Sequence, residues 1–156
     1  MVRAGALGDT LMATPVVRAL RRRYPEATID FLCAEAAAPL LETSPHVARV
    51  LPLRHRNLPW WLSLEKQRLT RRMRAARYDF AVLLESAPRF HRLLARAGIA
   101  RVLSFRQRPF DPAAHSIVNN LRAAGFAMPD QEEAGALDME LHVRPEDGRR
   151  AEGLLG

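Results

Sequence analysis

Cysteine, lysine and long apolar stretches are almost absent from this chain of 156 residues. The one cysteine, Cys33, excludes an internal disulfide, and its apolar neighbours predict a small buried side chain rather than a reactive thiol. No stretch approaches the roughly 18 apolar residues that a membrane-spanning helix needs. Residues 1–10 lack the charged, apolar and small-residue order of a secretory signal, so we expect the protein to stay in the cytoplasm.

Acidic residues are too few to balance the basic ones, and the formal net charge is +7. One interpretation is attraction to an anionic partner, such as nucleic acid, an acidic glycolipid or a membrane surface. The other is a coding preference for arginine, because Lys66 is the only lysine among 24 basic residues. The total charge favours the second interpretation, while its distribution along the chain still carries information.

Short apolar runs alternate with helical patterns along the sequence. Runs rich in β-branched and aromatic residues predict strands at residues 27–33, 48–53, 78–85 and 100–105. Apolar spacing and capping residues predict helices at residues 11–23, 36–41, 62–77, 90–97, 115–124 and 145–155. Gly98 and Gly125 follow two of these helices as end caps. This order predicts an α/β fold, a Rossmann-like doubly wound parallel sheet.

The two ends of the chain suggest how it is divided. Residues 1–140 are expected to form the Rossmann-like domain, and residues 141–156 a connector and the start of a second domain. Only Met1–Arg3 precede the first glycine loop, whereas a strand normally has roughly five or six residues. We therefore expect the first strand to be truncated.

The segment RAGALGDTLMATP, residues 3–15, holds the most informative motif. Gly5 and Gly8 predict a tight strand-to-helix turn at the edge where open α/β sheets bind ligands. The spacing matches neither a dinucleotide fingerprint nor a phosphate-binding P-loop. Asp9 follows, either as the N-cap of the next helix or as a carboxylate that stays ionised and acts as a base.

The same region is similar to a known family. The passage RAGALGDTLMATPVVRALRRRYPEATIDFL resembles the opening of glycosyltransferase family 9, the heptosyltransferases of lipopolysaccharide assembly. The likeness continues, less specifically, through LLETSPHVARVLPL, ARYDFAVLLE, ARVLSF and HSIVNNLRAAGF. It covers nearly the whole chain.

This resemblance implies the N-terminal half of a two-domain GT-B glycosyltransferase. Such an enzyme transfers heptose from ADP-heptose to a lipopolysaccharide core or lipid A-linked acceptor, without a metal and with inversion. The aspartate of the loop, here Asp9, would act as general base. The donor would bind a C-terminal domain that this chain lacks, so no cofactor is expected here and the chain alone is expected to be inactive.

Further candidate residues follow from the motif and from the strand ends. The expected acceptor-binding residues are Gly5, Gly8, Thr10, Glu85, Arg89 and His115. Glu85 ends the best predicted strand, Arg89 follows it, and His115 opens a helix and resembles a family position near the acceptor cleft. For Glu85 and His115, an ordinary strand-end carboxylate and a solvated helix-start histidine are equally good interpretations. The histidines show no metal-ligand spacing, so no metal site is expected.

A basic helical segment forms a separate candidate. Trp60 and Trp61 precede arginines that include Arg68, Arg71 and Arg72, a combination suited to an anionic membrane interface. With the glycolipid acceptor that the resemblance implies, one interpretation is a peripheral position on the inner face of the inner membrane. A solvated basic helix with locally packed tryptophans is the alternative.

Four other interpretations stay open at this stage. The chain could be part of another GT-B glycosyltransferase or of a sugar-nucleotide epimerase, or a non-catalytic relic. A basic nucleic-acid-binding module is the remaining alternative, but no helix-turn-helix, zinc-finger or RRM-type pattern is present, so no nucleic acid is expected as a partner.

Overall fold

The computed structural model describes residues 1–54, 58–127 and 137–155. Its centre is one sheet of five parallel strands in the order β3-β2-β1-β4-β5. The strands are β1 (Val2–Arg3), β2 (Asp30–Ala34), β3 (Arg49–Leu53), β4 (Ala81–Leu83) and β5 (Val102–Ser104). The predicted doubly wound parallel sheet is confirmed, and β1 lies at its centre between β2 and β4.

The strands are apolar on both sides because the sheet is covered on both faces. Alternating residues of β2 divide between two cores, with Phe31 and Cys33 in one and Leu32 in the other. The residues of β4 divide in the same way, with Val82 in the first core and Leu83 in the second. Near-continuous apolar strands are therefore the expected pattern of this parallel sheet.

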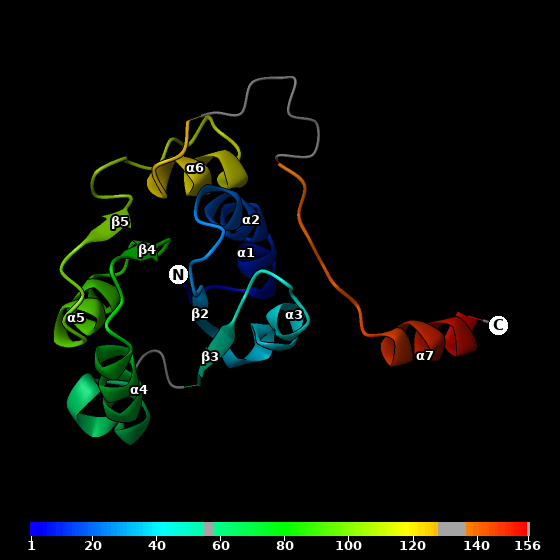
Figure 1. Ribbon diagram of the computed structural model, residues 1–156, viewed down its shortest axis with the longest axis horizontal. Coiled ribbons are helices and arrows are strands. Elements are labelled where there is room, and N and C mark those ends of the chain that lie inside the picture. The colour runs from blue at the N-terminus through cyan, green and yellow to red at the C-terminus, as the bar shows by residue number, and fades with distance from the viewer. Residues whose placement is uncertain (55–57, 128–136, 156) are drawn as a thin grey trace.

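Helices pack on each face of the sheet (Figure 1). Apolar residues of α2 (Thr14–Arg23), α3 (Pro39–Glu42) and α6 (Ser116–Ala123) belong to the first core. Those of α4 (Leu64–Ala76) and α5 (Pro88–Arg96) belong to the second. Cys33 is buried in the first core, where burial raises the pKa of its thiol to about 12, as expected for an unreactive cysteine.

Three predicted helices begin or divide differently in the structure. The helix predicted over 11–23 is two helices, α1 (Leu7–Leu11) and α2, and Pro15 lies in the first turn of the second. The helix predicted over 36–41 divides before Pro39 into a 3₁₀ turn, η1 (Glu35–Ala37), and α3. Proline lacks the N–H that a continuous helix would need and is tolerated in a first turn, so a new helix begins at each.

The helix predicted over 62–77 begins at Leu64, after a 3₁₀ turn, η2 (Trp60–Leu62). The Ser63 side chain accepts a hydrogen bond from the Lys66 N–H, which is the N-cap interaction. Leu62 therefore lies outside the helix, exposed rather than on its buried face. At the other predicted caps, Gly98 and Gly125 have φ of 78° and 94°, which confirms their expected role.

The last described segment leads away from the sheet. Glu140 pairs with Arg18 of α2 at 2.5 Å, and Arg144 pairs with Glu42 of α3 at 3.0 Å. Helix α7 (Pro145–Leu155) then extends outward, as Figure 1 shows. The expected division near residue 140 stays a prediction, and residues 128–136, which precede it, lie outside the described residues.

Candidate functional site

The loop after β1 places Asp9 at the carboxyl edge of the sheet. Helix α1 begins at Leu7, so Asp9 is its third residue and Ala6 is the N-cap. The Asp9 Oδ2 accepts a hydrogen bond from the Ala6 N–H at 3.1 Å. The expectation that Asp9 is itself the N-cap is therefore wrong, because the helix starts earlier than the sequence pattern suggested. Its carboxylate still stabilises the positive end of that helix.

Arg3, which the sequence analysis did not single out, orients the Asp9 carboxylate. Its Nη2 donates to Asp9 Oδ1 at 2.8 Å, and its Nη1 donates to the carbonyl of Leu84. The side chains of Arg3 and Asp9 are 17% and 32% exposed, so the pair is partly shielded but open to solvent on one side. A guanidinium pairing of this kind holds a carboxylate in a defined position.

Gly5 is required for close approach rather than for a turn. A Cβ at Gly5 would lie 2.2 Å from Asp9 Oδ2 and 3.0 Å from Asp9 Cβ. Gly8, in contrast, has no neighbouring atom within 4 Å of where its Cβ would be. Among the residues that the structure describes, positive φ occurs at neither glycine of this loop, so the predicted glycine turn is built from ordinary backbone angles.

Glu85 lies beside the same loop. It follows β4, and its Oε1 accepts a hydrogen bond from the Ala4 N–H at 2.7 Å. The carboxyl ends of β1 and β4 thus hold two carboxylates and one guanidinium together. This is the point where the chain order of the sheet reverses, which is the usual ligand position in open α/β folds.

The other expected acceptor-binding residues lie at different depths. Thr10 is fully buried, and its Oγ1 donates a long hydrogen bond to the carbonyl of Ala6 at 3.5 Å. It therefore supports the loop and does not face solvent. Arg89 is exposed in the first turn of α5, with its guanidinium 5.2 Å from the centre of the Phe90 ring. His115 is exposed and caps α6, accepting the Ile117 N–H at Nδ1. The described contacts do not join Arg89 or His115 to Asp9.

Two buried asparagines, Asn119 and Asn120, support this edge of the sheet, a role that the sequence analysis did not predict. The Asn120 Nδ2 donates to the carbonyl of Met12, where α1 meets α2. Asn119 exchanges hydrogen bonds with both backbone groups of Asp111. Because buried amides are costly when unpaired, these contacts fix the preceding loop to α6, and α6 to the junction of α1 and α2.

A cavity of about 430 Å³ lies beyond the ends of β3 and β4. Apolar side chains of Leu53, Trp61 and Phe90 contribute to its walls. Its basic residues are Lys66, Arg89, Arg92 and Arg96. Lys66 is buried and donates to the carbonyl of Leu58, and burial lowers the pKa of its ammonium. The cavity therefore combines apolar surface with positive charge.

The proposed membrane surface is exposed over the start of α4. Trp61 is 70% exposed, and Leu62 and Leu64 are each 67% exposed. Arg68, Arg71 and Arg72 are exposed on the helix that follows. The side chain of Trp60 lies outside what the structure describes. Across the described ranges, no helix has the length and apolar character to cross a bilayer, and no cluster of three potential metal ligands is present.

The curated proteins that are similar in sequence to this chain include lipopolysaccharide heptosyltransferases. No family model matches the sequence. The lipopolysaccharide heptosyltransferase 2 of Salmonella typhimurium is 36% identical over 83 residues, which are 52% of this chain and 23% of that protein. The lipopolysaccharide heptosyltransferase 3 of Escherichia coli K12 is 28% identical over 78 residues, 49% of this chain and 23% of that protein.

Solved structures extend the likeness to the whole fold. The structure of E. coli ADP-heptose lps heptosyltransferase II superposes with a TM-score of 0.74 at 20% identity, covering 99% of this chain and 49% of that one. The glycosyl transferase family 9 structure from Veillonella parvula gives the same TM-score at 18% identity, covering 97% of this chain and 47% of that one. The chain spans about half the length of these structures. In sequence over about half its length, and in fold over almost all of it, this chain is similar to the heptosyltransferases of glycosyltransferase family 9, the family that its opening residues resemble.

Proposed function

We propose that this chain is the acceptor-binding part of a heptosyltransferase-like glycosyltransferase of the GT-B class, with Asp9 as its general base. The observation that carries the proposal is the Asp9 carboxylate, which lies partly open at the carboxyl edge of a heptosyltransferase-like sheet. Residues 1–140 would bind the acceptor, and residues 141–156 would lead into a donor-binding half. The substrates would be ADP-heptose and a lipopolysaccharide core or lipid A-linked acceptor.

The proposed chemistry is an inverting displacement. Asp9 takes the proton from an acceptor hydroxyl while that oxygen attacks the anomeric carbon of the donor heptose. The bond from this carbon to ADP breaks as the new glycosidic bond forms, and ADP leaves with the electron pair. Because a carboxylate accepts the proton and ADP is a stable anion, this scheme requires no metal from the chain.

Arg3 and Gly5 prepare Asp9 for this role. The Arg3 guanidinium and the Ala6 N–H each engage one oxygen of the carboxylate, which fixes its plane. Each oxygen retains a further lone pair for the acceptor hydroxyl. Such prior orientation lowers the entropy cost of aligning base and nucleophile.

The basic cavity beside α5 supplies the proposed contacts to acidic acceptor groups. Arg89 and Arg92 lie on the first turns of α5, and both line the cavity. Arginine pairs well with phosphate because its planar N–H groups match two oxygens at once. Phosphorylated core sugars would therefore be held here while a sugar hydroxyl reaches Asp9.

Binding of the acceptor by the chain alone tests this proposal. We expect calorimetry to detect binding of a phosphorylated inner-core saccharide, and no release of ADP when ADP-heptose is added. Arg89→Ala should weaken the binding by roughly tenfold, since a hydrogen bond to a charged group contributes about 1.5 kcal/mol. Arg22→Ala, which removes an exposed arginine from the last turn of α2, serves as the control. Equal losses for both variants, or sugar transfer by the chain alone, would contradict the proposal.

We also propose that the surface formed by Trp61, Leu62, Leu64 and the arginines of α4 contacts the inner face of the inner membrane. Aromatic and aliphatic side chains enter the headgroup boundary, while arginines attract anionic lipids. The exposed fractions of Trp61, Leu62 and Leu64 support this, because three large apolar side chains are left to solvent within four residues.

Vesicle sedimentation measures this contact. We expect the chain to sediment with vesicles that contain phosphatidylglycerol, and less with vesicles of phosphatidylcholine alone or at high salt. Trp61→Ala should reduce the bound fraction several-fold, because a tryptophan is a large part of the inserted apolar area. Phe110→Ala removes an aromatic residue that is 51% exposed elsewhere and should leave binding unchanged. An equal bound fraction on vesicles with and without phosphatidylglycerol would contradict the proposed membrane contact.

A further inference from the structure

The segment of residues 137–144, which we call the strap, lies against α2 and α3 and leads to α7. Its side chains alternate between solvent and the helices beneath. The exposed ones include four large apolar residues, Leu137, Met139, Leu141 and Val143. Between them, Glu140 and His142 are half-buried. The strap therefore docks by a polar side, and charges and hydrogen bonds hold it in place.

Hydrogen bonds from side chains of the two helices attach the backbone of the strap. The Thr14 Oγ1 of α2 accepts the Glu140 N–H at 2.9 Å. The Thr43 hydroxyl, at the end of α3, donates to the carbonyl of His142. These contacts place both half-buried side chains of the strap over the gap between α2 and α3.

The Glu140 carboxylate is the centre of this attachment. Its Oε1 accepts a hydrogen bond from Arg18 of α2 at 2.5 Å. Its Oε2 lies 3.5 Å from the Nε2 of His46 and 3.8 Å from the Nε2 of His142. Burial raises the pKa of Glu140, but the hydrogen bond and charge of Arg18, together with the two histidines, outweigh it and hold this pKa below its usual value. The carboxylate therefore stays charged in weakly acidic solution.

The imidazole of His142 has an unsatisfied atom at this contact. Within the described part of the chain, its Nε2 is shut off from solvent and has no hydrogen-bond partner. The ring lies edge-on to that of His46, with 6.4 Å between the two centres. A proton on either ring turns the contact with Glu140 into a charge attraction. Two imidazolium ions this close repel each other, so we expect one bound proton rather than two.

The other charges on the packed elements are already engaged or face solvent. Glu42 of α3 pairs with Arg144 of the strap at 3.0 Å. Arg21 of α2 donates to backbone carbonyls, including that of His46 at 3.3 Å. Asp138 is exposed, and its carbonyl accepts from Arg18 at 3.3 Å. Arginines and paired carboxylates keep their charge between pH 5 and 8, whereas histidine ordinarily titrates there.

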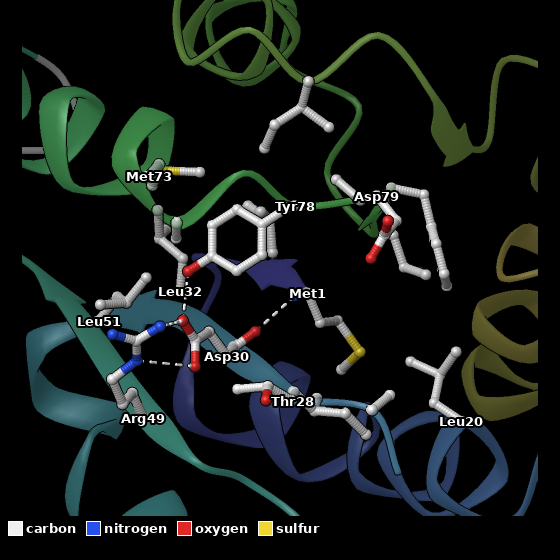
Figure 2. A pocket seen from close by; sticks show the side chains of 18 of the residues that line it. Met1, Leu20, Thr28, Asp30, Leu32, Arg49, Leu51, Met73, Tyr78 and Asp79 are labelled. Carbon is white, nitrogen blue, oxygen red and sulfur yellow. Dashed lines mark hydrogen bonds and ion pairs between the residues drawn. The ribbon is translucent and has the colours of Figure 1, made fainter. Parts of the chain in front are cut away.

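A second buried carboxylate, at the amino edge of the sheet, shows the contrast. Asp30 pairs with Arg49 at 2.8 Å and accepts a hydrogen bond from the Tyr78 hydroxyl (Figure 2). Burial raises the pKa of Tyr78, so both of these side-chain partners keep their protons at neutral pH. The side chains around Asp30 thus form a permanent clamp, while those around Glu140 include two that change charge.

We propose that the strap is a pH-sensitive clasp, held more tightly against α2 and α3 when one of the two histidines beside Glu140 carries a proton. An imidazolium there gains an ion pair that a neutral imidazole lacks, so proton binding and docking favour each other. The added stabilisation is present in weakly acidic solution and is lost as the pH rises through the range where histidine titrates. Helix α7 follows the strap directly, so release of the clasp frees this helix as well. This inference does not depend on the proposed glycosyltransferase function.

Amide hydrogen exchange at Glu140 measures the docking, because its N–H is bonded to Thr14 when the strap is bound. The protection factor divides the exchange rate expected for an unfolded chain by the observed rate, which removes the ordinary effect of pH on exchange. We expect this factor to be about fivefold higher at about pH 5.5 than at about pH 7.5, the effect of one partly exposed ion pair. The Leu84 amide, bonded to the Val2 carbonyl inside the sheet, is the internal reference and should not show this change.

Two variants separate the histidines of the clasp from others. His46→Gln combined with His142→Gln removes both titrating partners, and its protection factor at Glu140 should be the same at both pH values. His91→Gln removes a histidine of α5 and should keep the difference. Equal protection at the two pH values in the parent chain, the parent's difference in the double variant, or an equal change at Leu84 would overturn the proposal.

Discussion

Asn in place of Asp9 is expected to lower sugar transfer by about 10²- to 10⁴-fold, the usual contribution of a positioned general base. The amide has the same shape, and its oxygen can still accept the Ala6 N–H, so the loop should persist. It cannot take a proton from an acceptor hydroxyl near neutral pH. The loss should therefore appear in turnover rather than in acceptor affinity.

The measurement needs a donor-binding half. Residues 1–140 joined to the remaining half of a heptosyltransferase 2 relative give a fusion in which acceptor-dependent ADP release is followed. Asp79→Asn is the matched control, because Asp79 is an exposed aspartate at the amino edge of the sheet, the opposite edge from Asp9. Turnover that Asp9→Asn leaves unchanged in an active fusion would show that another group removes the proton.

Gly5→Ala is expected to displace the Asp9 carboxylate and, with it, most of the activity. The new methyl group would overlap Asp9 Oδ2, and the Asp9 Cβ at 3.0 Å allows little room for rotation. Asp9 would lose its hydrogen bonds to Arg3 and Ala6, which costs about 1–3 kcal/mol in the free energy of unfolding. A misplaced base also costs about 10²-fold in turnover.

Gly8→Ala is the control for this change within the same loop. No atom lies within 4 Å of the added methyl group, and Gly8 is inside α1, where alanine is favoured over glycine by up to about 1 kcal/mol. Gly5→Ala should therefore lower both the melting temperature and the rate of ADP release. Gly8→Ala should leave the rate unchanged and keep or slightly raise the melting temperature. If Gly5→Ala and Gly8→Ala behave alike, the close packing of Gly5 against Asp9 is not what orients the base.

The fold was largely predictable because its strands are buried on both faces. A strand such as β4 appears in the sequence as a continuous apolar run, and the glycines that end α5 and α6 appear at their caps. Helix starts were less predictable. Pro15 and Pro39 each lie in the first turn of a new helix, and an apolar pattern that continues across a proline conceals the break.

The candidate site was predictable only in part. Asp9 and Glu85 were identified by their places after strands, a local property of the sequence. Arg3 was not, because its role depends on bonds to a carboxylate six residues later and to a carbonyl 81 residues later. Asn120 was missed as a structural residue for the same reason, since it reaches a carbonyl 108 residues away. Local patterns carry no record of such partners.

By itself, the sequence determined the strand and helix order, the two-sided burial of the sheet and the placement of an aspartate after a glycine-containing loop. These follow from apolar periodicity and backbone preference, which act between near neighbours in the chain. The tertiary structure alone decided which oxygen of Asp9 each donor engages, and that Gly5 is required by contact rather than by its backbone angle. Those features depend on contacts between atoms that the folded sheet brings together. Spacing between near neighbours in the sequence does not specify such contacts.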